Sequence, residues 1–251
     1  MSGHSKWKTI QHKKGAADAK RGKIFSKMAK ELMVVAKAGG GNPDTNTALR
    51  NLIVRCKASS MPNENIDRAI KKGTGELAAD VMEDITYEGF AAGGVGVVVK
   101  VLTDNKNRAA AELRHIFSKN GSSLAAPGSV SRGFKRRGQI FVDAKVIEED
   151  KLMDIVLNAG ADDMSLDGEQ FEILTDPNAF QGVLDALEKA GVKTEDSAIR
   201  LVPETYVSIT DKTVAKAVMK FVETLEDNDD VQDVYTNMDL DDSVLALISA
   251  D

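Results

Sequence analysis

The chain has little cysteine, little histidine and no long apolar run, and each shortage excludes a class of protein. Its single cysteine, Cys56, cannot form an intramolecular disulfide or a cysteine-based zinc finger, which favours a reducing compartment. Cys56 lies on the apolar face of an expected helix, so we predict an inert packing thiol. No stretch approaches the ~18 consecutive apolar residues of a membrane span, and the amino terminus lacks the apolar core of a signal peptide. We therefore expect a cytoplasmic protein without a membrane partner.

Motifs for catalysis and for cofactors are also missing. The three histidines, His4, His12 and His115, form no HExxH motif, and the chain has neither a GxxxxGKS/T phosphate loop nor a GxSxG nucleophile elbow. The glycines around Gly93 precede a β-rich run, whereas a dinucleotide loop lies between a strand and a helix. His115 is expected to be a partly buried helix residue. We predict a protein that is not an enzyme and uses no cofactor, metal or small-molecule substrate, with a catalytic group assembled only in space as the alternative.

Charge is distributed unevenly along the chain. Residues 1–72 hold 16 basic and 5 acidic residues, and the remaining residues hold 17 and 34, which together give the formal net charge of −6. A basic segment on an acidic body is typical of a protein that binds an anion. The natural anion for such a segment is the phosphate backbone of a nucleic acid.

Residues 1–75 are predicted to form a small helical domain. A basic tail comes first, followed by a short helix over about Gly15–Lys20. Apolar residues then recur at helical spacing, with turn residues between the apolar stretches. This pattern predicts three amphipathic helices, over Ile24–Ala38, over about Asn46–Ser59, and from Pro62 to a glycine stop at Gly73.

The rest of the chain predicts an α+β multidomain fold. Two β-rich runs, ITYEGF and GVGVVVKVLTD, indicate a hairpin, and a helix ending at Gly121 follows. A strand near Gln139–Val142 then opens the order β-α-β-β-α-β, which is that of a ferredoxin-like unit. The pieces on either side of this unit are each incomplete. We predict a discontinuous α+β domain of residues 76–132 and 210–251, into which a ferredoxin-like domain of residues 133–209 is inserted.

The basic residues near the amino terminus are the candidate binding site. Lysines fall opposite the apolar face of the first long helix, and only Asp18 and Glu31 interrupt the basic run. A solvated face usually mixes both signs, so we predict a contact with nucleic acid. The candidate residues are His4, Ser5, Lys6, Trp7, Lys8, His12, Lys13, Lys14, Lys20, Arg21, Lys23, Lys27 and Lys30.

Three further features have alternative interpretations. Trp7 either stacks on a base or pins the tail to the helices. The acidic runs Glu226–Asp230 and Asp239–Asp242 are expected to be solvated loops. A smaller basic island is either a second RNA contact or only a charged hairpin, and it comprises Arg132, Lys135, Arg136 and Arg137 around Phe134.

Blocks of sequence spread over the whole chain are similar to those of one known family. They are GHSKW at 3–7, DAKRGKIF at 18–25, GGGNPD at 39–44, YEG at 87–89, DNKNR at 104–108, ELRHIFSKNG at 112–121, GSV at 128–130 and DVQDVYTN at 230–237. Together they resemble the YebC/PmpR family. That family includes bacterial proteins labelled transcriptional regulators and the mitochondrial translational activator of cytochrome c oxidase.

The resemblance implies a fold and two accounts of function. The fold has a helical amino-terminal domain and two α+β domains, one interrupted by the other. The first account is direct binding to promoter DNA, and the second is action on the translating ribosome to relieve stalling, notably at proline runs. The family's motifs fall here on His4, Ser5, Lys6, Trp7, Lys20, Arg21, Gly22 and Lys23.

The residues favour RNA over duplex DNA. A helix-turn-helix reader needs a recognition helix with exposed base-reading side chains, and usually a symmetric dimer. Arg50, Asn51 and Arg55 are candidates for base reading, but no dimerisation heptad is present and the stronger charge lies on the tail. We predict a monomeric, ribosome-associated translation factor that binds rRNA or tRNA, with a promoter-binding transcriptional regulator as the alternative.

Overall fold

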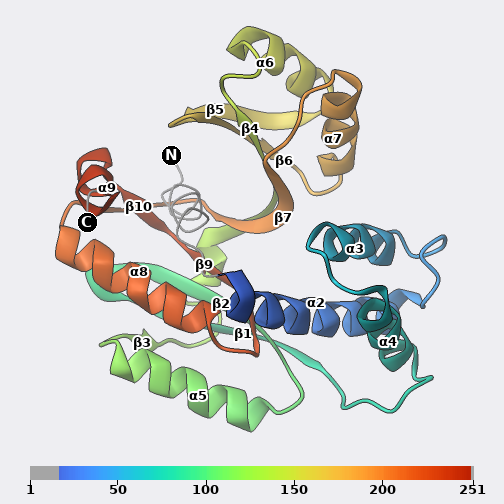
Figure 1. The fold of residues 1–251 in the computed structure, drawn as a ribbon. Coiled ribbons are helices and arrows are strands. Elements are labelled where there is room, and N and C mark those ends of the chain that lie inside the picture. Colours follow the sequence, from blue (N-terminus) through green and yellow to red (C-terminus); the bar gives the residue numbers. More distant parts are fainter. Residues whose placement is uncertain (1–16, 250–251) are drawn as a thin grey trace.

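The protein is an α+β multidomain molecule with a helical amino-terminal region and two four-stranded antiparallel sheets (Figure 1). The structure is a computed structural model that describes residues 17–249. Each large sheet has helices packed on one face. Between residues 17 and 249, no helix combines the length and the apolar character needed to cross a membrane.

In the described part of the amino-terminal region, from residue 17 onward, three helices pack so that their apolar faces share one core. α2 contacts both of the others, and Leu32, Leu49 and Cys56 are fully buried between them. Asn46 caps the second helix by accepting from the Leu49 N–H, and its side-chain amide donates to the carbonyl oxygens of Val35 and Gly40. The helices are α2 (Ala17–Gly39), α3 (Thr47–Ala58) and α4 (Asn63–Thr74).

Two predicted boundaries in this region are wrong. The short helix expected near Gly15–Lys20 is not separate in the described part of the chain, because residues 17–39 form one continuous helix. Its interior Gly22 costs only about 1 kcal/mol relative to alanine, which does not end a long helix. α4 likewise runs through Gly73, and Gly75, with a left-handed φ of 84°, ends it.

Gly73 has a packing role instead of a capping role. A Cβ atom at this position would clash with the carbonyl oxygen of Met33 and lie 2.9 Å from the Cβ of Ala36. The missing side chain therefore lets α4 approach the backbone of α2 closely.

The first large sheet is built from segments far apart in the sequence. Its strand order is β3-β1-β2-β9, so β2 has the hairpin partner β1 on one side and the late strand β9 on the other. Val99 of β2 is opposite Tyr87 on one neighbour and Val234 on the other. Two helices cover one face. The elements are β1 (Glu83–Phe90), β2 (Gly96–Thr103), α5 (Lys106–Lys119), β3 (Ser123–Leu124), α8 (Lys212–Glu226) and β9 (Val231–Thr236), with a 3-10 turn, η1 (Ala92–Gly94), inside the hairpin.

The three consecutive valines of β2, Val97–Val99, follow from burial on both faces. Val97, Val99 and Val101 pack into the core beneath α5 and α8. Val98 points to the other face, where it meets Phe134 and neighbouring side chains at the base of the inserted unit. A stretch of strand covered on both sides needs apolar residues at successive positions, which explains why alternation is absent over Val97–Val99.

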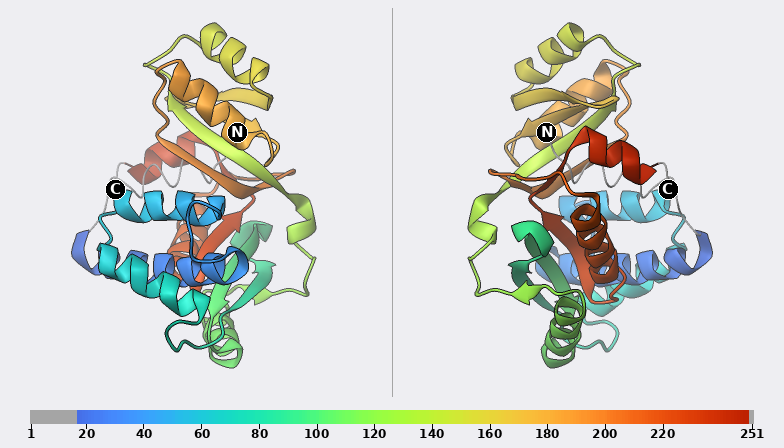
Figure 2. Two further views of the ribbon diagram at one scale, coloured as in Figure 1. Left: turned by 90° about the vertical axis from the view of Figure 1, so that its right-hand side faces the viewer. Right: turned by 90° about the vertical axis from the view of Figure 1, so that its left-hand side faces the viewer.

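The inserted unit has the β-α-β-β-α-β order that the sequence predicted. Its sheet order is β5-β6-β4-β7 with every neighbour antiparallel, and α6 and α7 pack on one face. Figure 2 shows this unit at one end of the molecule, joined to the rest through β4 and β7. The elements are η2 (Ser131–Gly133), β4 (Phe134–Asp143), α6 (Glu149–Asn158), β5 (Ala161–Asp167), β6 (Gln170–Thr175), α7 (Phe180–Lys189) and β7 (Asp196–Pro203).

The chain leaves the insertion through a small parallel pair, β8 (Val207–Ile209) with β10 (Met238–Leu240), and the described part ends in α9 (Asp242–Ser249). The acidic run Asp239–Asp242 is therefore not a solvated loop, because β10 and the start of α9 occupy it. We propose that residues 76–132 and 210–251 form one domain, interrupted by residues 133–209, and that residues 1–75 form another. The pairing of β9 with β2 supports this division.

Glu88 fixes the connection that leads into the inserted unit. Its carboxylate accepts hydrogen bonds from the backbone N–H groups of Gly128, Val130 and Ser131, at 2.7–2.8 Å, and from the Ser131 hydroxyl at 2.7 Å. The residue is only 5% exposed. Burial alone would raise the pKa of Glu88, but these donors lower it to about 2. A buried, ionised carboxylate thus organises the loop before β4.

Candidate nucleic-acid interface

The lysines predicted to face away from the helical core lie on one side of α2, at a spacing of one helical turn. Lys23 and Lys27 both reach the carboxyl end of α8. Lys23 Nζ donates to the carbonyl oxygen of Asp227 at 2.9 Å, and Lys27 Nζ donates to that of Glu226 at 2.7 Å. A helix ends with carbonyl groups that lack intrahelical partners and with a partial negative charge, so cations are favourable there. These two lysines therefore bind the end of α8.

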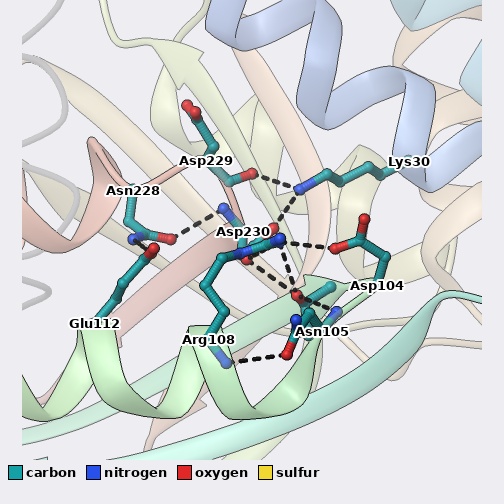
Figure 3. A network of polar contacts seen from close by, with 9 residues as sticks. Lys30, Asp104, Asn105, Arg108, Glu112, Asn228, Asp229 and Asp230 are labelled. Atoms are coloured by element: carbon teal, nitrogen blue, oxygen red, sulfur yellow. Dashed lines mark hydrogen bonds and ion pairs between the residues drawn. The ribbon is translucent and has the colours of Figure 1, made fainter.

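Lys30 makes the most buried contact of this row. Its Nζ donates to the backbone oxygen of Asp229 at 2.8 Å and to Oδ1 of Asp230 at 2.6 Å (Figure 3). Asp230 is 3% exposed and also accepts from Arg108 and from the Thr103 hydroxyl, both at 2.9 Å. Burial alone would raise the pKa of Asp230, but the donors outweigh it and hold the pKa below the usual range.

Arg108 links this cluster to the start of α5. It lies 2.7 Å from Asp104 and 2.9 Å from Asp230, and both carboxylates raise the pKa of its guanidinium. Figure 3 shows the side chains converging from α2, from the segment before α5, and from the loop between α8 and β9. The prediction that Glu226–Asp230 is a solvated loop is therefore wrong for its last residue, which is the buried centre of the cluster.

The lysine row is thus engaged by protein in this structure. Lys27 belongs to α2, and its side chain is buried against the end of α8. This burial lowers the pKa of Lys27. Any nucleic acid that used Lys23, Lys27 and Lys30 would compete with the acidic loop for them. Their assignment to nucleic acid stays a prediction.

Most of the other candidate residues cannot be placed. His4, Ser5, Lys6, Trp7, Lys8, His12, Lys13 and Lys14 lie outside the described residues, and Lys20 and Arg21 are described only as backbone in the first turns of α2. Whether Trp7 stacks on a base or pins the tail therefore stays open.

A groove between α2 and α4 carries exposed cations that the sequence did not single out. It has a volume of about 380 Å³, an apolar floor that includes Phe25 and Met33, and Arg68 and Lys72 at its rim. Both rim residues are exposed, and within residues 17–249 neither side chain makes a hydrogen bond or an ion pair. The i, i+4 spacing of Arg68 and Lys72 was visible in the sequence, but the groove below them depends on how the two helices pack.

The second basic island lies mainly on β4. Lys135 Nζ is 2.5 Å from a carboxylate oxygen of Glu204, and Arg137 is paired with Asp162. Arg132 and Arg136 are exposed and form no ion pair among the residues that the structure describes. The predicted strand starts earlier than expected, at Phe134, because the island pairs with β7. The structure leaves both interpretations of the island open.

The two arginines of α3 that were considered for base reading contact other groups of the protein. Arg50 donates to the backbone oxygens of Pro43 and Asp44, at 3.0 and 2.9 Å. Arg55 lies 3.3 Å from Glu31 of α2. These contacts reduce the number of side chains that α3 has available for a DNA groove.

The histidine and the cysteine of the described residues show no sign of a catalytic or metal site. His115 is exposed, contrary to the expectation of partial burial, because the core face of α5 is set by Leu113 and Phe117 on the other side of the helix. Cys56 is 0% exposed and burial raises its pKa, which confirms the packing role. Among residues 17–249, no group of three histidine, cysteine or acidic side chains is placed to hold a metal ion.

The fold defines a multidomain α+β protein with a helical amino-terminal region. Known proteins match the chain over nearly all of its length. Residues 5–76 match the TACO1/YebC protein N-terminal domain, and residues 82–238 match the TACO1/YebC second and third domain. The chain belongs to the TACO1/YebC family.

Individual relatives agree with this assignment. A probable transcriptional regulatory protein of Desulfotalea psychrophila is 49% identical over 245 residues, covering 98% of each chain. One of Syntrophus aciditrophicus is 49% identical over 251 residues and covers both chains completely. The crystal structure of a conserved hypothetical protein from Aquifex aeolicus is similar with a TM-score of 0.80 and 44% identity, covering 89% of this chain and 92% of that one. The names of the relatives support a regulatory role.

Proposed function

We propose that this chain is a monomeric, cytoplasmic, nucleic-acid-binding regulator of gene expression that is not an enzyme. In this proposal it acts on the translating ribosome, where it binds rRNA or tRNA and relieves stalling, for example at proline runs. The names of its relatives support the regulatory part. Translation as the regulated step, and RNA as the target, are the further claims of the proposal.

The observation that carries the proposal is the separation of charge. The basic segment of residues 1–72 stands against an acidic remainder. An acidic surface repels polyanions, so a nucleic acid that approaches this molecule is directed towards the helical region. Arg68 and Lys72 on that region are exposed and form no ion pair with any described residue, which supports the region as the surface of contact.

Cosedimentation with ribosomes over a salt series tests the proposal. Specific docking persists at physiological salt, whereas charge-driven adhesion declines steeply with salt concentration. Lys13→Glu and Lys14→Glu should weaken cosedimentation and slow elongation through proline runs in a translation reporter. They are better test positions than Lys23, because Lys23 also contacts the loop after α8. Normal elongation with both variants, together with no cosedimentation of the unchanged protein, would refute the proposal.

A promoter-binding transcriptional regulator is the second candidate, and the names of the relatives favour it. It predicts a sequence-specific complex with duplex DNA that survives competitor DNA at physiological salt. The engagement of Arg50 and Arg55 by neighbouring protein groups is unfavourable for α3 as its recognition helix. A sequence-specific complex that depends on Asn51, an exposed residue between them, would support this candidate over the ribosomal one.

A further inference from the structure

We propose that the groove between α2 and α4 binds one unstacked nucleotide of a single-stranded or looped RNA. The base lies on the apolar floor of the groove and the phosphate lies at Arg68 and Lys72. This inference rests on the proposed function, because it assumes that the helical region contacts RNA, and it adds where that contact is made and what part of the RNA it takes.

The floor has the chemistry of a stacking surface. Phe25, Ala29 and Met33 follow one another along one side of α2, and the buried side chains of Met61 and Ala69 also line the groove. Phe25 and Met33 are only half-buried, although they pack against the helical core. Aromatic rings and thioethers are polarisable, and any of the four bases can stack on them.

The size of the groove suits a single nucleotide. A volume of about 380 Å³ falls at the lower end of the ~300–1,000 Å³ typical of small-molecule pockets. A duplex presents its bases stacked and paired, so its base faces are not accessible to such a groove. Single strands and loops offer unstacked bases, which proteins commonly bind on aromatic side chains.

The residues of α4 that line the groove supply two cations and one amide side chain. Arg68 and Lys72 are one helical turn apart on α4 and project beside the floor, where no described carboxylate pairs with them. Asn65 lines the same groove one turn earlier, and its amide offers both a donor and an acceptor to a base edge. A phosphate at the rim and a base on the floor are the two halves of one nucleotide.

The two sides of α2 therefore have different partners. Lys23, Lys27 and Lys30 lie on the side that meets the end of α8, and their amines are occupied there. The side that carries Phe25 and Met33 faces α4 and is open along the groove. Among the described residues that line the groove, the cations are Arg68 and Lys72 of α4, which an incoming phosphate can reach without displacing the acidic loop.

The test uses the full chain and a fluorescently labelled single-stranded RNA of mixed sequence, with binding measured by anisotropy over a salt series. Arg68→Ala with Lys72→Ala should weaken binding about tenfold or more. It should also reduce the slope of log K against log salt by about 0.7, since one phosphate contact on a single strand contributes ~0.7. The matched control, Lys37→Ala with Lys57→Ala, removes two exposed charges from the same region outside the groove. It should change affinity less than about threefold.

A second variant tests the floor. Phe25→Leu keeps an apolar side chain but removes the ring, and it should weaken binding by about fivefold or more, as expected for one lost base–aromatic stack. If Phe25→Leu lowers the thermal unfolding midpoint, the rim variants still decide the question, because Arg68 and Lys72 are exposed. RNA carrying 4-thiouridine should crosslink to peptides that contain Phe25 or Met61.

Several results would overturn the inference. Equal losses in the rim variant and its control would show a general charge effect, and unchanged binding in the rim variant would place the contact elsewhere. If the rim variant lost as much affinity for duplex DNA as for single-stranded RNA, the groove would not be binding an unstacked nucleotide. These outcomes leave the proposed function standing as long as the unchanged protein binds RNA and cosediments with ribosomes. Failure of the unchanged protein in both assays would remove the proposed function as well.

Discussion

Lys30 and Asp230 are 200 residues apart in the sequence, and their side chains meet at 2.6 Å. The lysine side chain is 18% exposed and the aspartate side chain 5%. The pair joins α2 of the helical region to the loop before β9, and Arg108 extends the contact to α5. The helical region is therefore fastened to the body through a buried ionic cluster, and not through an apolar interface alone.

Removing the carboxylate at the centre of this cluster should destabilise the protein. Asp230→Asn leaves Lys30 and Arg108 without their shared partner. Breaking a fully buried ion pair costs ~3–5 kcal/mol, and a smaller loss applies here because both cations have some access to water. We expect the free energy of unfolding to fall by about 2–3 kcal/mol, measured by urea denaturation followed by circular dichroism. Lys30→Met in the same background measures the coupling between the two side chains.

The exposed pair in the same row provides the control. Lys23 and Asp227 are 3.3 Å apart, with side chains 43% and 70% exposed. Solvent-exposed pairs contribute ~0.2–1 kcal/mol, so the cycle of Lys23→Met and Asp227→Asn should give a coupling of about 0.5 kcal/mol or less. A coupling for Lys30 and Asp230 no larger than this would contradict the structural role assigned to Asp230.

Glu88 should make stability depend on acidity. Its pKa is about 2 in the folded protein, whereas an unfolded glutamate has a pKa of ~4.3. A carboxyl group with a lowered folded-state pKa stabilises the protein fully above the unfolded pKa. That stabilisation is lost as pH falls from about 4.3 towards 2, and the shift corresponds to about 3 kcal/mol. Measuring the free energy of unfolding between pH 7 and pH 2 checks this.

Glu88→Gln separates this group from other carboxylates. The amide keeps the shape of the side chain, but it cannot ionise and it brings an NH2 group among N–H donors. The variant should be less stable than the unchanged protein at pH 7, and the difference should shrink as the pH approaches 2. A constant difference over that range would show that the charge of Glu88 does not contribute.

The sequence predicted those parts of the fold that depend on neighbours along the chain. The repeat of Val214, Val218 and Leu225 defined α8, and the order of strands and helices from Gln139 onward defined the inserted unit. These patterns are local, because the spacing of apolar residues reports which face of an element is buried. The same reasoning found that the lysines of α2 form one face.

The spacing of the lysines along α2 did not indicate which group they contact. A row of cations has the same sequence signature whether it meets a phosphate backbone or a helix end, since only the tertiary fold brings the end of α8 to α2. The groove was missed for a related reason. Its floor belongs to α2 and its rim to α4, so neither helix alone shows a site. Gly73 was misread as a stop because a glycine needed for close packing resembles a glycine needed for a turn.

Cys56 should be unreactive in the folded protein. Its side chain is fully buried in the helical core, and burial raises its pKa, so little thiolate is exposed to a reagent. A thiol reagent such as dithionitrobenzoate should react slowly in buffer and rapidly in urea. Ala58→Cys adds an exposed thiol two positions further along α3 and serves as the control. Equal rates for the two thiols in buffer would show that α3 opens readily.

Two glycines in the helical region should respond to alanine in opposite directions. Gly73 lies where a Cβ would clash with the backbone of α2, and relief requires the two helices to separate. Overpacking of this kind costs ~1–3 kcal/mol, so Gly73→Ala should lower the free energy of unfolding by about that amount.

Gly22 lies inside α2 with open space where a Cβ would be placed. Alanine is favoured over glycine in a helix by ~0.5–1 kcal/mol, so Gly22→Ala should raise the free energy of unfolding. Both changes add one methyl group to a glycine in a helix, which means that their difference isolates the contact between α4 and α2. If both variants were stabilised alike, the close approach of the two helices at Gly73 would be wrong, and with it the shape of the groove that they enclose.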